Sequence, residues 1–345
     1  MKAFITGSAG FIGFHIANRL LARGVHVAGF DGMTSGDDAQ MKAMRLAILS
    51  AQPNYTHFAG MLEDAGALRR AVEDFAPDIV IHLAASAGIR ESTDNPDSFI
   101  SANVIGTFNL LDVIKDFPIR HLLLASSSSV YGANAKIPFT EADHTDEPLS
   151  VYAATKKSME VMAHSYSHLW RMPTTIFRFF TVYGPYGRTN MAIFRFVDAI
   201  ANDRPIDIYG TGAMCRDFTY IDDLVEAVDR LIKIAPVEES RVKVNGIVDT
   251  LSSNAPYRIV NIGGGDPASL RELVALIESA LGKRAIRRYL DMQLGDVPYT
   301  RASPALLKAL VGPLSMTPLD MGIERFVAWY RSTMAGHGEA LRRFA

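Results

Sequence analysis

The stretch Gly7-Ser8-Ala9-Gly10-Phe11-Ile12-Gly13 decides the fold class of this chain. Residues 2–6, directly before it, have the pattern of a short buried strand, and residues 14–23, directly after it, have helical periodicity. A second apolar strand, residues 25–30, ends at Asp31. Strand, glycine turn, helix, strand and acid in this order form the arrangement that binds a dinucleotide. The chain is therefore predicted to begin with a dinucleotide-binding βαβ unit.

Each glycine of the turn has its own task in that prediction. Gly7 permits the tight turn, Gly10 lets backbone amides approach a pyrophosphate, and Gly13 lets the helix and strand pack closely. The N-terminus of the helix then faces the phosphates. Asp31 is expected to accept hydrogen bonds from the adenosine ribose and to repel a 2′-phosphate, which favours NAD over NADP. The alternative for Asp31 is a carboxylate that only caps the turn before Gly32.

Composition narrows the class of protein. The 345 residues allow one large or two modest domains, and 48% hydrophobic with 21% charged residues fits a globular protein with a full core. A net charge of −2 gives no reason to expect a nucleic-acid or membrane-surface partner. The single cysteine, Cys215, excludes an internal disulfide and fits a reducing cytoplasm, which is the predicted location. No apolar run approaches the ~18 residues of a membrane span, and the nine histidines show no metal-binding spacing.

Strand and helix patterns alternate through the first half of the chain. Helices are expected near 38–51, 65–75, 97–117 and 152–170, and strands at 55–59, 77–85, 121–125 and 174–180. This alternation predicts an α/β fold with a doubly wound parallel sheet of the Rossmann type. Beyond residue 181 the elements become shorter, which predicts a smaller α/β substrate-binding domain at 181–345. The dinucleotide-binding domain would comprise residues 1–180, with a returning segment near 216–234.

The second informative stretch is Ser150-Val-Tyr152-Ala-Ala-Thr-Lys156. Residues i and i+4 share a helix face, so the Tyr152 phenol and the Lys156 ammonium would lie side by side. A free tyrosine has a pKa near ~10, and lowering it to near neutrality takes about 4 kcal/mol. One ammonium about 4 Å away, in an effective dielectric of about 20, supplies roughly that much. The pair is a candidate proton-transfer device. The alternative is an ordinary surface helix, since a Tyr and a Lys four residues apart are common there.

Several motifs together resemble the extended short-chain dehydrogenases/reductases. They are G-x-x-G-x-x-G at 7–13, H-L-A-A at 82–85, S-S-S-S-V-Y-G at 126–132, Y-x-x-x-K at 152–156 and R-F-F-T-V-Y-G-P at 178–185. Within that superfamily the chain is most similar to the UDP-glucuronate 4-epimerases. The resemblance continues through residues 216–223 and 295–297, so it covers nearly the whole chain.

This resemblance implies NAD-dependent epimerisation of UDP-glucuronate to UDP-galacturonate through a transient 4-keto sugar. Tyr152 would take the proton of the sugar 4-hydroxyl while C4 passes a hydride to NAD, and the hydride would return to the other face. Lys156 would bind the nicotinamide ribose and hold the phenolate, and Ser127 would bridge the 4-oxygen and the phenol. By the same analogy the product would serve polysaccharide biosynthesis. The family is commonly a homodimer built on a four-helix bundle, for which helices 97–117 and 152–170 are the candidates.

The resemblance also implies binding residues, each of which has an ordinary loop contact or salt bridge as its alternative. The glucuronate carboxylate needs charged and hydroxyl donors, and Thr181 and Arg188, with Ser128 and Ser129 alongside, match the positions that meet it. The positions that match UDP-binding residues are Arg90, Tyr209, Arg216, Gln293 and Asp296. The positions that match NAD-binding residues are Gly7, Gly10, Phe11, Ile12, Gly13, Asp31, Leu62, Leu83, Ala84, Ala85, Asn103, Tyr152 and Lys156.

Two positions depart from the family pattern. Met61-Leu62 stands where an Asp-Leu pair near the adenine is usual, so an acceptor for the adenine amino group is missing. Ser86 stands where this subgroup often has Gln, which bears on fine substrate preference.

Other functions on the same fold remain open at this point. UDP-glucuronate decarboxylases typically carry a Glu just before V-Y-G, and 4,6-dehydratases an Asp-Glu pair there, whereas this chain has Ser128-Ser129. The missing carboxylate favours epimerisation over both. A redox-inactive NAD-binding scaffold is the non-enzyme alternative, and such proteins tend to lose the Tyr, Lys or Ser that this chain retains.

Overall fold

The computed structural model describes residues 1–34, 38–264, 267–291, 297 and 299–334. Gln293 and Asp296, two of the predicted UDP-binding residues, lie outside this part of the chain. Among the described helices, none has the length and apolar character needed to cross a membrane.

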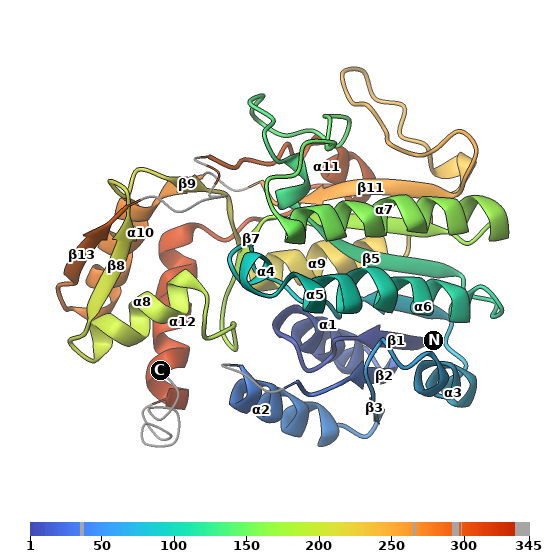
Figure 1. The fold of residues 1–345 in the computed structure, drawn as a ribbon, viewed down its shortest axis with the longest axis horizontal. Coiled ribbons are helices and arrows are strands. Elements are labelled where there is room, and N and C mark those ends of the chain that lie inside the picture. The colour runs from blue at the N-terminus through green and yellow to red at the C-terminus, as the bar shows by residue number, and fades with distance from the viewer. Residues whose placement is uncertain (35–37, 265–266, 292–296, 298, 335–345) are drawn as a thin grey trace.

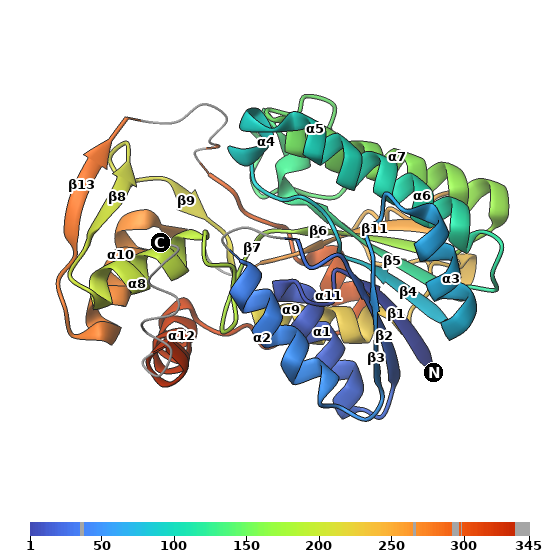
Figure 2. The same cartoon turned by 60° about the horizontal axis from the view of Figure 1, so that its bottom comes forward.

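A parallel sheet forms the larger part of the molecule (Figures 1 and 2). Within the described residues it has seven strands in the order β11-β6-β5-β4-β1-β2-β3, and all their ladders are parallel. The strand order reverses between β1 and β4, the switch point at which such sheets bind ligands. The strands are β1 (Lys2–Thr6), β2 (His26–Asp31), β3 (Tyr55–Ala59), β4 (Ile79–His82), β5 (His121–Ser127), β6 (Thr174–Phe179) and β11 (Tyr257–Ile262).

Helices cover both faces of this sheet, because the strands are apolar on both sides; every residue of β5, for example, is buried. One face carries α1 (Phe11–Ala22), α2 (Ala39–Ser50), α9 (Ile221–Leu231) and α11 (Ala305–Val311). The other carries α3 (Ala65–Phe75), α5 (Pro96–Phe99), η1 (Ile100–Ile105), α6 (Gly106–Ile114) and α7 (Val151–Trp170). The predicted doubly wound Rossmann sheet is confirmed. The helix expected over 97–117 is divided by the π-helical turn η1.

A smaller group of elements lies beside the sheet, at the left of Figure 1. It contains the parallel pair β8 (Pro205–Tyr209) and β13 (Ile286–Leu290) with α8 (Ala192–Ala201), α10 (Leu270–Leu281) and α12 (Leu319–Met334). Two short ladders form separate two-stranded sheets: β7 (Thr181–Tyr183) pairs with β10 (Phe218–Tyr220), and β9 (Cys215–Arg216) pairs with β12 (Ala268–Ser269). The remaining short elements are α4 (Glu91–Asp94), η2 (Ser128–Tyr131) and η3 (Glu238–Ser240).

Candidate active site

The glycine turn between β1 and α1 has the close packing that its sequence predicts. Gly7 has φ +73°, and a Cβ built on it would lie 2.7 Å from the Ala84 backbone nitrogen. A Cβ on Gly13 would overlap the Gly7 carbonyl oxygen. Only glycine fits at either position, since a side chain would push the turn away from β4 or from α1. The turn is thereby held against the residues that follow β4.

The residues around this turn fit a dinucleotide. Phe11, Ile12 and Gly13 form the first turn of α1, where backbone N–H groups have no acceptor within the helix, and they line a large cavity together with Gly7 and Gly10. Such a helix N-terminus suits a phosphate.

Asp31, at the end of β2, lines the same cavity. Its side chain is only 6% exposed and accepts hydrogen bonds from Ala9 N–H (3.1 Å) and Met33 N–H (2.9 Å). The bond to Met33 is the turn-capping contact of the simpler interpretation. The bond to Ala9 fixes the carboxylate beside the glycine turn, where a ribose would follow the phosphates.

The departure at Met61 has a clear structural consequence. The Met61 thioether lies over Gly32, so closely that a Cβ at Gly32 would overlap the sulfur. Leu62 is buried, and its carbonyl accepts a hydrogen bond from the Asn109 amide (2.9 Å). Both side chains line the cavity next to Asp31. At position 61 the cavity lining is therefore apolar where a carboxylate is usual in the pattern, and the next carboxylate along the chain that lines the cavity is that of Glu63.

The residues after β4 form the floor of the cavity, which Leu83, Ala84, Ala85 and Ser86 line. The Thr6 hydroxyl accepts from Leu83 N–H and Ala84 N–H (3.2 Å each). Asn103 accepts from Ser86 N–H (2.8 Å) and donates to the Ser86 carbonyl (3.0 Å) and to the Thr155 hydroxyl (2.9 Å). Asn103 is fully buried, so its visible role is to hold this loop against α7.

Ser127 and Tyr152 bring two hydroxyl groups to the carboxyl end of β5. Ser127 is the last residue of β5; its hydroxyl donates to Ser129 Oγ and accepts from Ser129 N–H (3.1 Å each). Ser150 caps α7 by accepting from Ala153 N–H (3.1 Å), so the helix starts at Val151, one residue before Tyr152. Burial raises the pKa of Tyr152, while its hydrogen bond with Ser127 and the charge of Arg188 act in the opposite direction.

Lys156 lies one helical turn after Tyr152 on α7, but its ammonium is engaged elsewhere. The side chain is 3% exposed, and Nζ donates to the Ala125 carbonyl of β5 (2.9 Å). Burial lowers the pKa of Lys156 to about 7, against the opposing charge of Glu160. The expected lowering of the Tyr152 pKa by Lys156 is not found in this structure, because burial dominates the phenol and the ammonium contacts a backbone carbonyl.

A buried ion pair stands behind Lys156. Arg178 of β6 donates to both carboxylate oxygens of Glu160 (2.9 and 2.8 Å), and the Ser126 hydroxyl donates to the same carboxylate (2.6 Å). Since Glu160 is one turn beyond Lys156, this pair fixes α7 against the ends of β5 and β6.

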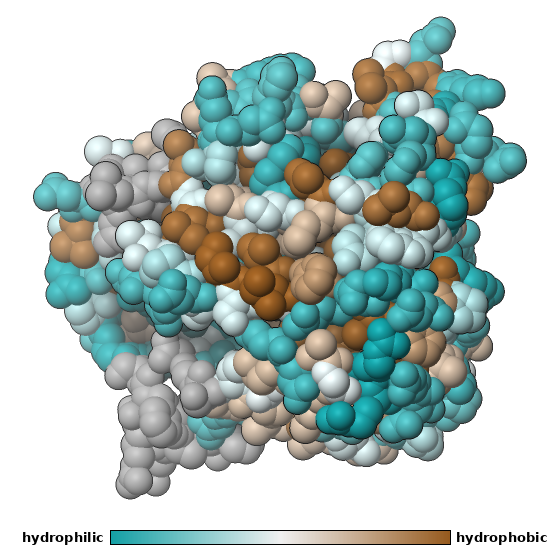
Figure 3. Space-filling model, turned by 45° about the vertical axis from the view of Figure 1, so that its right-hand side comes forward, coloured by the Kyte–Doolittle hydropathy of each residue, from teal (hydrophilic) through white to brown (hydrophobic). Residues whose placement is uncertain are grey.

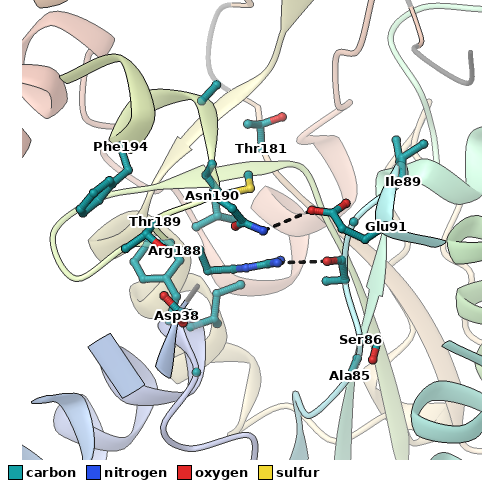
Figure 4. Close-up of a pocket in the computed structure, with 18 of the residues that line it drawn as sticks. Asp38, Ala85, Ser86, Ile89, Glu91, Thr181, Arg188, Thr189, Asn190 and Phe194 are labelled. Atoms are coloured by element: carbon teal, nitrogen blue, oxygen red, sulfur yellow. Dashed lines mark hydrogen bonds between the residues drawn. The ribbon is translucent and has the colours of Figure 1, made fainter. Parts of the chain in front are cut away.

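Several of the residues predicted to bind substrate come from the loops after β4 and β7, and Figure 4 shows Arg188 across the pocket from Ile89 and Glu91. Arg188 Nη2 donates to the Ala87 carbonyl (3.0 Å), and Thr181 begins β7, with its N–H bonded to the Asp217 carbonyl (3.1 Å). The Arg90 guanidinium stacks on the Tyr209 ring, with 4.3 Å between its central carbon and the ring centre. All of the predicted substrate residues that the structure describes line the one cavity: Arg90, Ser127, Ser128, Ser129, Tyr152, Thr181, Arg188, Tyr209 and Arg216.

Comparison with known proteins agrees with this geometry. Residues 3–244 match the model of the NAD dependent epimerase/dehydratase family. The chain belongs to this family. A probable UDP-glucuronate 4-epimerase from Rhizobium meliloti (strain 1021) is 56% identical over 330 residues, 96% of this chain and 97% of that protein. Protein CapI from Staphylococcus aureus is 46% identical over 330 residues, 96% and 98% of the two chains.

Solved structures of the same kind are also similar. The crystal structure of UDP-glucuronic acid 4-epimerase from Bacillus cereus in complex with UDP-glucuronic acid and NAD has a TM-score of 0.85, at 29% identity over 96% of this chain and 99% of that one. The predicted membership among extended short-chain enzymes is thus confirmed, and the cofactor of this NAD dependent epimerase/dehydratase is NAD.

Two cavity residues of this epimerase/dehydratase were not expected from its sequence. Asn190 Nδ2 donates to Glu91 Oε1 (3.2 Å), so the loop after β7 contacts α4 across the cavity (Figure 4). The partners are 99 residues apart, and no periodic pattern or motif marks either one.

His82 and Cys215 show no catalytic environment. The His82 ring is fully buried between the hydroxyls of Thr6 (2.7 Å) and Thr107 (3.0 Å), and burial lowers its pKa to about 3. Cys215 lies in β9, where its thiol contacts the Ala213 carbonyl (3.5 Å). His82 is therefore a neutral structural residue.

Proposed function

We propose that this chain is a UDP-glucuronate 4-epimerase, which interconverts UDP-glucuronate and UDP-galacturonate through a transient 4-keto sugar. The observation that carries the proposal is the composition of one cavity. The hydroxyls of Ser127 and Tyr152 and the guanidinium of Arg188 all line it. Several relatives carry the corresponding name, including the 56% identical probable UDP-glucuronate 4-epimerase from Rhizobium meliloti.

The catalytic roles follow from the groups at the end of β5. Bound NAD supplies the acceptor and donor of the hydride at C4. Tyr152 takes the proton of the 4-hydroxyl and later returns it. The Ser127 hydroxyl bridges the sugar 4-oxygen and the phenol by hydrogen bonds. Because burial raises the pKa of Tyr152, deprotonation needs positive charge nearby. The charge of Arg188 and the hydrogen bond with Ser127 act in this direction, whereas the Lys156 ammonium donates to the Ala125 carbonyl and keeps the proposed role of binding the nicotinamide ribose.

The choice of substrate follows from the charges in the cavity. Arg188 presents a planar guanidinium that pairs well with the carboxylate of a uronate. Ser128 and Ser129 place hydroxyls, and no carboxylate, beside the catalytic Ser127. This composition supports epimerisation, since the acid or base that a decarboxylase or dehydratase uses at that point is lacking. Arg90 and Tyr209, stacked on each other, suit the uridine diphosphate.

We further propose that the chain forms two domains with different ligands. Residues 1–180, with the returning segment near 216–234, hold NAD, and residues 181–345 mostly bind the UDP-sugar. The packing of α9 against α1 and the place of β11 in the parallel sheet support a return of the later chain to the first domain.

A homodimer is the assembly we propose. Large apolar side chains are exposed on the helices η1, α6 and α7, and brown atoms gather on this face in Figure 3. They are Ile100, Ile105, Phe108, Val161, Leu169 and Trp170. Two copies of this face would bury the apolar side chains in a four-helix arrangement.

The cytoplasmic location stays a prediction.

The function is tested by incubating the purified protein with UDP-glucuronate and following the sugar protons by NMR. UDP-galacturonate without net consumption of NAD is the expected product. Release of carbon dioxide with a UDP-pentose would identify a decarboxylase instead. Unchanged UDP-glucuronate in the presence of NAD would refute the epimerase.

A further inference from the structure

Arg45 is a fully buried arginine that none of the catalytic steps uses. It lies in the middle of α2, its side chain is 0% exposed, and it does not line the cavity. Removing a guanidinium from water is costly unless all of its donors find partners in the protein. The partners of Arg45 therefore indicate what its burial achieves.

Those partners belong to two loops that are distant in the sequence. On one side, Nη1 donates to the Ala9 carbonyl (3.0 Å). On the other, Nε and Nη2 donate to the Tyr186 carbonyl (3.0 and 2.8 Å), and Nη2 also donates to the Gly187 carbonyl (3.3 Å). A single planar group thus bridges the segments around residues 9 and 186.

Each of these loops carries part of the active site. Ala9 is in the glycine turn, and its N–H is bonded to Asp31, so both of its polar backbone groups are held. Tyr186 and Gly187 directly precede Arg188. Tyr186 has φ +57°, a conformation that costs a non-glycine residue energy and persists only when its surroundings impose it.

Asp38 completes the arrangement on the same side of the pocket as Arg188 (Figure 4). Its carboxylate accepts from Arg45 Nη1 (2.7 Å) and Nη2 (3.3 Å). A carboxylate engaged in this bidentate way is a weaker competitor for Arg188. The pairing therefore leaves the positive charge of Arg188 to a ligand.

We propose that Arg45 is a positioning residue for uronate recognition: it ties the Arg188 loop to the glycine turn and withholds the Asp38 carboxylate from Arg188. This rests on the proposed function, in which Arg188 binds the sugar carboxylate. Lysine cannot replace Arg45, because one ammonium on a flexible stem cannot serve both loops and the carboxylate in a fixed plane.

The test compares Arg45→Lys with Arg258→Lys in the NAD-loaded protein. Arg258 is a matched control: it is 1% exposed, donates to both Asp249 oxygens (2.9 and 3.0 Å) and to the Ser240 carbonyl (2.7 Å), and lies outside the cavity. Calorimetric titration with UDP-glucuronate and with UDP alone separates carboxylate recognition from nucleotide binding. Thermal unfolding of both variants reports any general loss of stability.

Arg45→Lys should weaken UDP-glucuronate about tenfold and UDP less than about twofold, as expected for a misplaced charged hydrogen bond. Arg258→Lys should change neither affinity by more than about twofold, whatever its melting temperature. Equal effects of the two variants on both ligands would overturn the proposal. If Arg45→Lys does not fold, Arg45→Gln, which keeps amide donors for the carbonyls, is measured in the same way.

The wild-type protein separates the existence of a uronate site from the role of Arg45. Binding of UDP-glucuronate no tighter than UDP would remove the uronate site and, with it, the proposed function. A selective wild type with an equally selective Arg45→Lys variant would leave the function standing and remove the role of Arg45.

Discussion

Arg188 Nη2 donates a hydrogen bond to the Ala87 carbonyl, 3.0 Å away, and so connects two loops that are 101 residues apart in the sequence. The first loop follows β4 and the second follows β7, and they form facing walls of the cavity in Figure 4. A neutral carbonyl is a weaker partner for a guanidinium than a carboxylate is. The carboxylate of a uronate would therefore replace the Ala87 carbonyl favourably as the partner of the Arg188 guanidinium.

Arg188→Ala should weaken the binding of UDP-glucuronate about 10- to 100-fold and the binding of UDP-glucose far less. Only UDP-glucuronate has a sugar carboxylate, so only its complex loses a charged hydrogen bond. Dissociation constants from calorimetry with both sugars measure this difference. Arg195→Ala, which removes another arginine from the same cavity, should leave both affinities within about twofold. Equal losses for the two sugars in Arg188→Ala would mean that Arg188 does not bind the carboxylate.

Tyr152→Phe should lower kcat by about 10³-fold or more while leaving the affinity for UDP-glucuronate nearly unchanged, since it removes only the proton-transfer group. Single-turnover assays with NMR detection of the product measure the rate, and titration measures binding. Tyr166→Phe on the same helix, whose hydroxyl contacts Asp112, should keep full activity. A Tyr152→Phe enzyme with normal turnover would refute the assigned base.

The sequence predicts this site unevenly, and the reason is the range of the interactions. Strands β1 to β6 and the glycine turn follow from local periodicity and turn chemistry, so their prediction agrees with the structure. The i, i+4 spacing places Lys156 one turn from Tyr152, but the partner of its ammonium is the Ala125 carbonyl on another strand. No pattern within α7 contains that information.

Elements that depend on distant pairing were not expected. The strand β11 joins the sheet by pairing with β6, about 80 residues earlier, after a stretch with little regular structure. The π-helical turn η1 interrupts a helix whose apolar spacing looked continuous. The burial of Arg45 could not be predicted from the sequence, because a single arginine in an amphipathic helix is normally exposed to solvent, and its partners are distant in the sequence.

Val161→Glu should convert a dimer into a monomer, because Val161 is 56% exposed on the apolar face of α7 and a buried, unpaired carboxylate opposes association. Light scattering at micromolar concentration measures the mass. Val248→Glu, at a 68% exposed valine outside this face, should leave the mass unchanged. A monomeric wild type would contradict the proposed assembly itself.

Glu141→Gln should stabilise the protein at pH 8 by about 3 kcal/mol and have little effect at pH 4. Burial raises the pKa of Glu141 from its ordinary 4.5 to about 7, although its Oε1 accepts from Asn261 N–H (2.9 Å). The folded protein therefore holds a proton that the unfolded chain loses between these two values, and wild-type stability falls as the pH rises from about 4.5 to about 7. Glutamine keeps an oxygen acceptor and cannot ionise, so this loss disappears.

Glu278→Gln provides the control of opposite sign. Burial raises the pKa of Glu278, but the Ala285 N–H (2.8 Å) and the charges of Arg287 and Arg284 outweigh it, and the net pKa is lowered. Its ionised form stabilises the fold above the ordinary carboxyl pKa, so its replacement should destabilise the protein at pH 8. Urea unfolding across this pH range measures both variants. Equal and parallel losses for Glu141→Gln and Glu278→Gln would show that Glu141 is ionised in the folded protein at neutral pH.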